Sequence, residues 1–153
     1  MNDYQSVRQG VREGARQTVV ADYGSSTACG INGPAATVTG TGGTNAQKMI
    51  CTTKQRAAIG DSLRVKVVYT PGCNSVSGAP SSGCPVGGTN DFGKVKVCAT
   101  RQAQSITGLL TPFLKNVNLR SKIEMRAEKD LSSGATQLTS TEETDPSGAW
   151  SWC

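Results

Sequence analysis

Six cysteines and no histidine constrain this chain more than any other feature of its sequence. Zinc sites usually combine cysteine with histidine or use closely spaced cysteine pairs. Here the closest two cysteines, Cys73 and Cys84, stand eleven positions apart. We therefore expect three disulfide bonds, no metal or other cofactor, and an oxidising compartment outside the cytoplasm. The six residues are Cys29, Cys51, Cys73, Cys84, Cys98 and Cys153.

The composition explains why disulfides would help this chain to fold. Of its 153 residues, only 36% are hydrophobic and 5% are aromatic, and 18 are glycine. That length corresponds to a single domain, 1–153, whose lean core leaves little surplus over chain entropy. Disulfides would supply part of the missing stability.

Residues 3–22 predict an amphipathic helix. Tyr4, Val7, Val11, Ala15 and Val19 fall on one stripe of a 3.6-residue period. Arg8, Arg12 and Arg16 recur every four residues and form a basic ridge. No convincing cap precedes the helix, so we interpret 1–22 as the lower part of a longer helix and 23–153 as the globular part.

The next segment predicts a loop followed by a second helix. Residues 23–44 are rich in Gly, Ser and Thr, with a short edge strand expected at 36–39. The helix is expected to have Thr44 as its N-cap and to stop at Gly60. GTGGT at 40–44 precedes it as a phosphate loop would, but it lacks the Lys-Ser/Thr pair, so a flexible linker is favoured.

Three segments alternate apolar and charged residues and predict strands: 64–70, 94–100 and 119–128. This alternation is typical of an antiparallel sheet with one solvated face. We expect an α+β fold, with the long N-terminal helix packed on an antiparallel sheet of three to four strands. Between the last two strands, Ile106, Leu109, Leu110, Phe113 and Leu114 predict a short helix, either packed on the core or exposed as a contact surface for a partner.

Enzymatic function is disfavoured. Without histidine, neither a Ser-His nor a Cys-His pair can form. Glu124 and Glu128 are expected to form surface ion pairs rather than a catalytic carboxylate pair. The net charge of +5 permits nucleic-acid binding, but the basic strands lack stacking aromatics, so that partner is disfavoured as well. No small-molecule substrate is expected.

The disulfide connectivity stays open, since six cysteines allow fifteen pairings. Cys73–Cys84 is the simplest local pair, because it would close a long Pro/Gly/Ser loop. Cys98 falls on the charged face of its strand. If Cys29 pairs with Cys51 and Cys73 pairs with Cys84, Cys98 is left for Cys153, and the polar tail would fold back over the open sheet face. Trp150 and Trp152 would then pack on Lys and Arg stems.

Several segments together resemble the TadE-like family of tight-adherence (Flp) pilus-assembly proteins, in its actinobacterial branch. VREGARQTVVADYG is similar to the helix that follows the family's membrane segment, with Gly14, Ala15 and Arg16 as its glycine-alanine-arginine element. The other matching segments are AQKMICTTKQR, KVKVCATRQAQSITGLLTPFL, LRSKIEMRAEKD with Met125, Arg126 and Glu128, and the WSWC tail. A TadG-like relative is the alternative.

The resemblance implies a pilin-like, non-enzymatic protein anchored in the cytoplasmic membrane, whose extracytoplasmic domain at the cell surface helps to assemble a type IV-like pilus. Other pilin-like subunits or assembly proteins are the implied partners. The family's basic leader and membrane helix are missing here, and we favour the interpretation that an upstream anchor has been removed before Met1. Candidate contact residues are Arg8, Arg12, Arg16, Ile106, Leu109, Leu110 and Phe113. The alternative is a secreted, disulfide-stapled adhesin or ligand-binding module.

Overall fold

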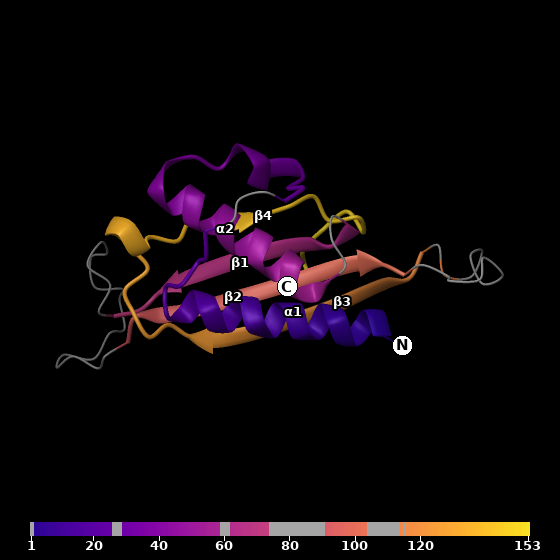
Figure 1. Cartoon of the computed structure of the whole chain (residues 1–153), viewed down its shortest axis with the longest axis horizontal. Helices are drawn as coiled ribbons and strands as arrows, with labels where there is room; N and C mark the ends of the chain where they lie inside the picture. The colour runs from indigo at the N-terminus through magenta and orange to yellow at the C-terminus, as the bar shows by residue number, and fades with distance from the viewer. Residues whose placement is uncertain (1, 26–28, 59–61, 74–90, 104–113, 115) are drawn as a thin grey trace.

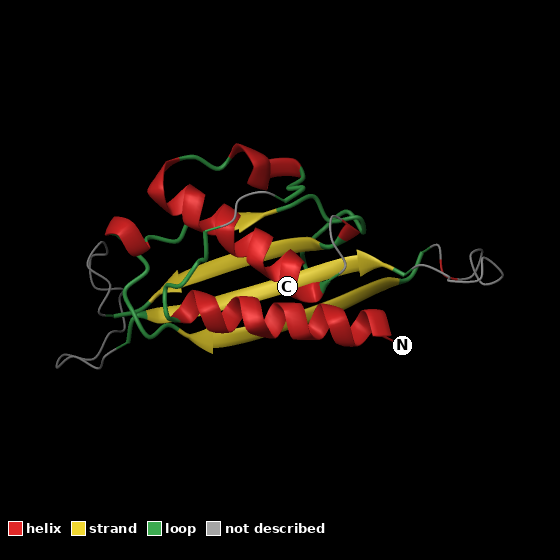
Figure 2. Cartoon of the chain, viewed as in Figure 1, coloured by secondary structure: helices red, strands yellow, loops and turns green. Residues whose placement is uncertain are grey.

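The computed structural model describes residues 2–25, 29–58, 62–73, 91–103, 114 and 116–153. It has an α+β fold in which two long helices pack on a four-stranded antiparallel sheet (Figures 1 and 2). The elements are, in chain order, α1 (Asn2–Val19), η1 (Gly33–Thr37), α2 (Gly40–Ala57), β1 (Arg64–Pro71), β2 (Gly93–Gln102), β3 (Asn118–Arg126), η3 (Gly134–Thr136) and β4 (Thr141–Glu142).

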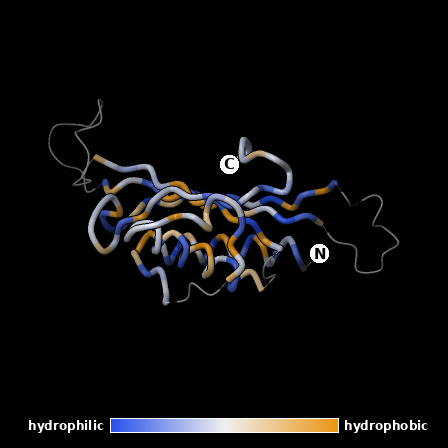
Figure 3. The backbone as a smooth tube through the Cα atoms, turned by 90° about the horizontal axis from the view of Figure 1, so that it is seen from above, coloured by the Kyte–Doolittle hydropathy of each residue, from blue (hydrophilic) through white to orange (hydrophobic). Residues whose placement is uncertain are grey.

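The sheet has the strand order β3-β2-β1-β4, and every neighbouring pair is antiparallel. Its register aligns Val67 with Val97 and Val97 with Ile123. The alternating apolar residues of the three long strands therefore lie side by side on one face, as the sequence predicts. Both helices cover that face, with α1 against β2 and β3 and α2 beside α1 against β1 (Figure 1). The C-terminal tail lies on the opposite face (Figure 3).

The apolar stripe of α1 is confirmed except at its first residue. Val7, Val11, Ala15 and Val19 are buried in the core, whereas Tyr4 is 48% exposed. At about 100° per residue, Tyr4 lies between Val11 and Ala15 around the helix axis, so its exposure reflects its position in the first turn of α1 and not the direction in which it points. The helix also ends earlier than residue 22, because the chain turns at Ala21 with a left-handed φ of 58°.

Glycines on a second side of α1 allow the two helices to approach closely. A Cβ on Gly10 would lie 2.6 Å from the Cβ of Ala57, and one on Gly14 would clash with the Oγ1 of Thr53. Since both facing residues belong to α2, the Gly10/Gly14 side of α1 is its contact with α2. Two sides of α1 are thus buried, and the third faces solvent.

The linker expected at 40–44 is wrong, because these residues form the first turns of α2 with Thr39 at the N-cap position. Gly42 and Gly43 are buried, and a Cβ on Gly43 would lie 2.6 Å from the Cγ1 of Val38. Close packing, rather than flexibility, is therefore what these glycines provide. At its other end α2 stops at Ala58, which has a left-handed φ of 53°. Gly60 lies outside the described residues.

The edge strand expected at 36–39 is also wrong. Gly33–Thr37 forms the short helix η1, which starts with Pro34 in its first turn and is closed by the Thr37 hydroxyl donating to the Pro34 carbonyl. The fourth strand is β4, which sequence alternation could not indicate because it has only two residues. The helix expected around Ile106–Leu114 falls almost entirely outside the described residues.

We expect Gly10→Leu to lower the free energy of unfolding by about 2–3 kcal/mol, because the added side chain would force α1 away from α2. Urea denaturation measures this change. Gln9→Leu is the matched control, since it adds the same side chain at an exposed position of the same helix and should change stability by less than about 0.5 kcal/mol. Equal losses in the two variants would contradict the close helix contact.

Candidate functional site

The outer side of α1 carries the basic ridge that the sequence predicts. Arg8, Arg12 and Arg16 are all exposed. Within the described part of the chain, none of their three guanidinium groups forms an ion pair, whereas Arg101 pairs with Asp3 of the same helix at 3.1 Å. Because the valine stripe and the glycines fix the other two sides of α1, the three arginines point together toward solvent.

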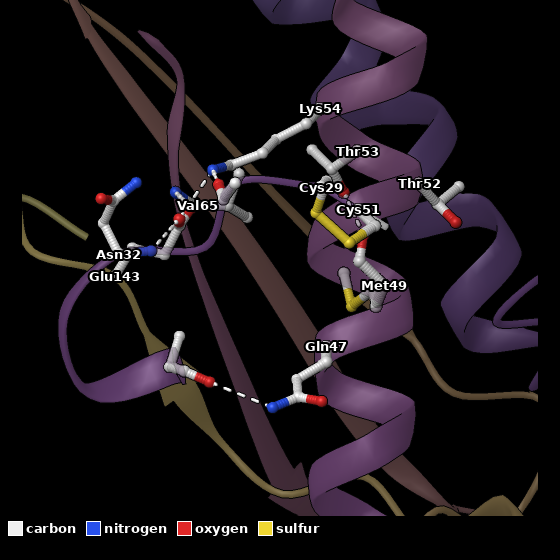
Figure 4. Close-up of a disulfide and its surroundings, with 12 residues drawn as sticks. Cys29, Asn32, Gln47, Met49, Cys51, Thr52, Thr53, Lys54, Val65 and Glu143 are labelled. Carbon is white, nitrogen blue, oxygen red and sulfur yellow. Dashed lines mark hydrogen bonds and ion pairs between the residues drawn. A yellow bond between two sulfur atoms is a disulfide. The ribbon is translucent and has the colours of Figure 1, made fainter. Parts of the chain in front are cut away.

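A buried ion pair joins Lys54 of α2 to Glu143, the residue that follows β4 (Figure 4). The Lys54 Nζ and the Glu143 Oε1 are 2.7 Å apart, and the two side chains are only 2% and 0% exposed. The Lys54 ammonium also donates to the Gly30 carbonyl. A pair buried this deeply depends on having its remaining hydrogen bonds satisfied.

The Glu143 carboxylate meets that requirement. Its Oε1 also accepts from the Asn32 backbone N–H at 2.9 Å, and its Oε2 accepts from the Val65 backbone N–H at 2.9 Å. In a regular antiparallel pair the Val65 N–H would donate to the Glu143 backbone carbonyl. Here it donates to the Glu143 side chain instead. Its N–H still donates to the Val65 carbonyl at 3.1 Å.

The Glu143 carbonyl is freed by this arrangement and accepts from the indole Nε1 of Trp150 at 2.8 Å. Every polar group of Glu143 is therefore occupied, and one residue joins α2, the segment after Cys29, β1 and the C-terminal tail. Glu143 is not among the residues expected from the sequence. The only signal in the sequence is the TEETD run, which gives no reason to choose Glu143 over Glu142.

The Cys29–Cys51 disulfide is confirmed, with the two Cα atoms 5.4 Å apart. Cys51 lies one turn before Lys54 on α2 (Figure 4). The bond therefore holds the chain next to Gly30 and Asn32, the two residues whose backbone groups contact the ion pair.

The Cys98–Cys153 disulfide is confirmed as well, with a Cα–Cα distance of 5.9 Å. Cys98 lies on the charged face of β2 but is fully buried. The tail covers that face, as expected. Cys73 is also disulfide-bonded, but Cys84 lies outside the described residues, as does the expected Cys73–Cys84 pair.

The two tryptophans of the tail have different surroundings. The Arg120 guanidinium lies 5.3 Å from the ring centre of Trp152, and the Lys122 Nζ donates to the Trp152 carbonyl at 3.3 Å, so this residue packs on basic side chains as expected. Trp150 instead lies buried beside Glu143. Its indole N–H has a buried acceptor there. The expected packing of Trp150 on Lys and Arg stems stays a prediction.

The remaining charged face of the sheet carries exposed ion pairs. Glu124 lies 3.3 Å from the Lys94 Nζ and 3.9 Å from the Lys96 Nζ, as the interpretation of these carboxylates as surface partners predicts. Glu128 is exposed. Such pairs contribute little to stability.

Two tyrosines in the core have perturbed acidities. Burial raises the pKa of Tyr23, whose hydroxyl donates to the Thr136 carbonyl at 2.6 Å. Burial also raises the pKa of Tyr69, whose hydroxyl donates to the Phe92 carbonyl at 2.7 Å. Both phenols act as hydrogen-bond donors that fix loops to the core.

The residues expected at a second contact surface, Ile106, Leu109, Leu110 and Phe113, lie outside the described residues. Among the described helices, none combines the length and apolar character that a membrane crossing needs. An open polar hollow of about 450 Å³ lies where α1 and α2 meet the loop after α1, lined in part by Gln17, Asp22, Thr52 and Arg56.

Removing either partner of the buried pair should be strongly destabilising. We expect Glu143→Gln and Lys54→Met each to lower the free energy of unfolding by about 3–5 kcal/mol, because each leaves buried polar groups uncompensated. The double variant should lose less than the sum of the two, by up to about 3 kcal/mol. Chemical denaturation of all four proteins measures this coupling, and strictly additive losses would contradict a direct pair.

The tail disulfide closes a long segment of chain, so its loss should be costly. We expect Cys98→Ala/Cys153→Ala to lower the free energy of unfolding by about 4 kcal/mol. Trp152→Ala, which keeps the disulfide and removes the Arg120 contact, should cost only about 1 kcal/mol. A double cysteine variant as stable as the parent would show that the tail does not constrain the sheet.

Comparison of the chain with protein-family models, with curated proteins and with solved structures finds no match.

Proposed function

We propose that this chain is the extracytoplasmic domain of a membrane-anchored, pseudopilin-like protein that takes part in assembling a tight-adherence, type IV-like pilus, and that its role is structural rather than enzymatic. The resemblance of its ordered segments to the TadE-like family supports this proposal. The disulfides support placement in an oxidising, extracytoplasmic compartment. Anchoring in the cytoplasmic membrane remains part of the proposal.

The observation that carries the proposal is the exposed basic ridge of an N-terminal helix whose other sides are buried. Arg8, Arg12 and Arg16 form no ion pair within the described chain, so their charge is available to an acidic neighbour. A helix of a subunit that assembles with others needs such a side, because contact between copies or partners requires a surface that folding has not used.

The position of α1 is compatible with anchoring. Its N-terminal end lies at one end of the sheet, so a helix continuing upstream of residue 2 would extend beyond the globular part (Figure 1). In this arrangement the arginines nearest the anchor would lie close to phospholipid head groups or to the neighbouring subunits of the pilus.

Charge reversal of the ridge tests the proposal. We expect Arg8→Glu/Arg12→Glu/Arg16→Glu, in the full-length protein of a piliated bacterium, to abolish most surface pili while the protein accumulates in folded form. The reason is that repulsion would replace attraction at the contact with an acidic partner. Electron microscopy counts the pili, and immunoblotting measures the protein.

Lys48→Glu/Arg56→Glu/Lys129→Glu is the matched control. It makes the same change in net charge at positions away from the ridge, where no ion pair occurs within the described chain. The control should leave pilus numbers unchanged. Normal piliation in the ridge variant, or equal loss in both, would contradict the proposed contact.

A further inference from the structure

The cations of the sheet and those of α1 are used differently. Every lysine and arginine of the four strands has a partner within the described residues. Five of them lie next to carboxylates: Lys66, Lys94, Lys96, Arg101 and Arg126. The three arginines of the ridge have no side-chain partner in that part of the chain. Folding therefore uses the cations of the sheet and leaves those of the ridge to an external partner.

The free charge of α1 forms a single row. With a rise of about 1.5 Å per residue, arginines four positions apart follow one another about 6 Å apart along the helix axis. The next row around the helix contains Gln5, Gln9, Glu13 and Gln17. Its one carboxylate, on Glu13, accepts from the Gln17 amide at 3.4 Å. The ridge is thus a line of positive charge beside a row that is mostly uncharged, and a partner that matches it carries its negative charge along a line as well.

The exposed side of α1 has no aliphatic side chain. From Asp3 to Val19, its exposed residues are the three arginines, Tyr4, Gln5 and Gln9. A helix that lies in a membrane surface needs an apolar face, and the valine stripe of α1 is buried in the core. Contact at this side therefore relies on charge and hydrogen bonds.

A second copy of the chain does not offer the matching row of acids within the described residues. The helix α2 has no acidic residue, and the two acids of α1, Asp3 and Glu13, stand ten positions apart. The acids of the strands, Glu124 and Glu142, already lie in ion pairs with lysines. The partner that complements the ridge is therefore a different protein.

A helix can present such a row. Acidic side chains at every fourth position repeat with the same spacing of about 6 Å and lie on one side. Two helices that pack nearly parallel or antiparallel keep their rows in contact, and each guanidinium can bind a carboxylate through two hydrogen bonds.

We propose that the partner of the ridge is a helix of a different protein, whose acidic side chains recur at every fourth position opposite Arg8, Arg12 and Arg16. This inference rests on the proposed function, in which an acidic neighbour contacts the ridge, and it adds what kind of neighbour that is.

Binding of two synthetic helical peptides to the disulfide-intact protein tests the proposal. Both peptides are alanine-based and carry three glutamates. In the matched peptide the glutamates are four residues apart, and in its isomer they are two residues apart, so that the middle one lies on the opposite side of the helix. We expect the matched peptide to bind about tenfold more tightly, since each exposed ion pair contributes modestly. NMR titration measures both dissociation constants, and the side-chain signals of the three arginines should shift.

Arg12→Gln should abolish the preference for the matched peptide, because it interrupts the row at its centre. Lys129→Gln is the matched control, since it removes an exposed cation that lies outside α1 and has no partner in the described chain. The control should keep the preference. Equal affinity for the two peptides, a preference that survives Arg12→Gln, or binding to phosphatidylglycerol vesicles without binding to the matched peptide would overturn the proposal.

The peptide result and the piliation result fail separately. If reversal of the ridge abolishes pili but the protein prefers neither peptide, the acidic neighbour stands and the helical partner is rejected. Normal piliation in the ridge variant rejects the proposed function itself, whichever peptide the protein binds.

Discussion

The fold of this protein depends on one buried carboxylate. Glu143 accepts from the Lys54 ammonium and from the backbone N–H groups of Asn32 and Val65, and its carbonyl accepts from Trp150. These partners come from four segments: α2, the stretch after Cys29, β1 and the C-terminal tail. Desolvating two charges is expensive, and that cost is offset only when all partners are in place, so the pair favours one arrangement of helix, loop, strand and tail over its alternatives.

The consequences of this arrangement reach both outer surfaces. Fixing α2 through Lys54 fixes the surface on which Gly10 and Gly14 of α1 rest, and this contact turns the three arginines of α1 outward. Fixing the tail through Trp150 brings Cys153 to Cys98 on the opposite face of the sheet. It also closes the β1 edge and leaves β3 as the long edge strand. The outward backbone groups of Arg120, Lys122 and Glu124 on β3 have no backbone partner within the described part of the chain. The buried contacts of Glu143 therefore determine which surfaces of the protein are available to partners.

The parts of this arrangement that follow simple periodicity could be predicted from the sequence. The valines of α1, β1 and β2 alternate or recur with clear periods. The charged-face position of Cys98 suggested that it is bonded, and Cys153 was the partner left once Cys29–Cys51 and Cys73–Cys84 were assumed. Glycine-rich residues 40–44 misled the prediction, because glycine in a close contact such as that of Gly43 with Val38 cannot be told from glycine in a linker without the neighbouring element. The Lys54–Glu143 pair was not predictable. Its partners are 89 positions apart, and in a sequence a buried lysine or glutamate cannot be told from a surface one.

Native-state hydrogen exchange tests most directly whether Glu143 joins these segments into one cooperative unit. The amide protons of Asn32 and Val65 and the indole proton of Trp150 all donate to this residue. If the account is correct, the three protons exchange with a single opening free energy equal to that of global unfolding. Exchange of the Asn32 or Trp150 proton through a separate opening of lower free energy would show that the loop and the tail detach independently, and would contradict the account.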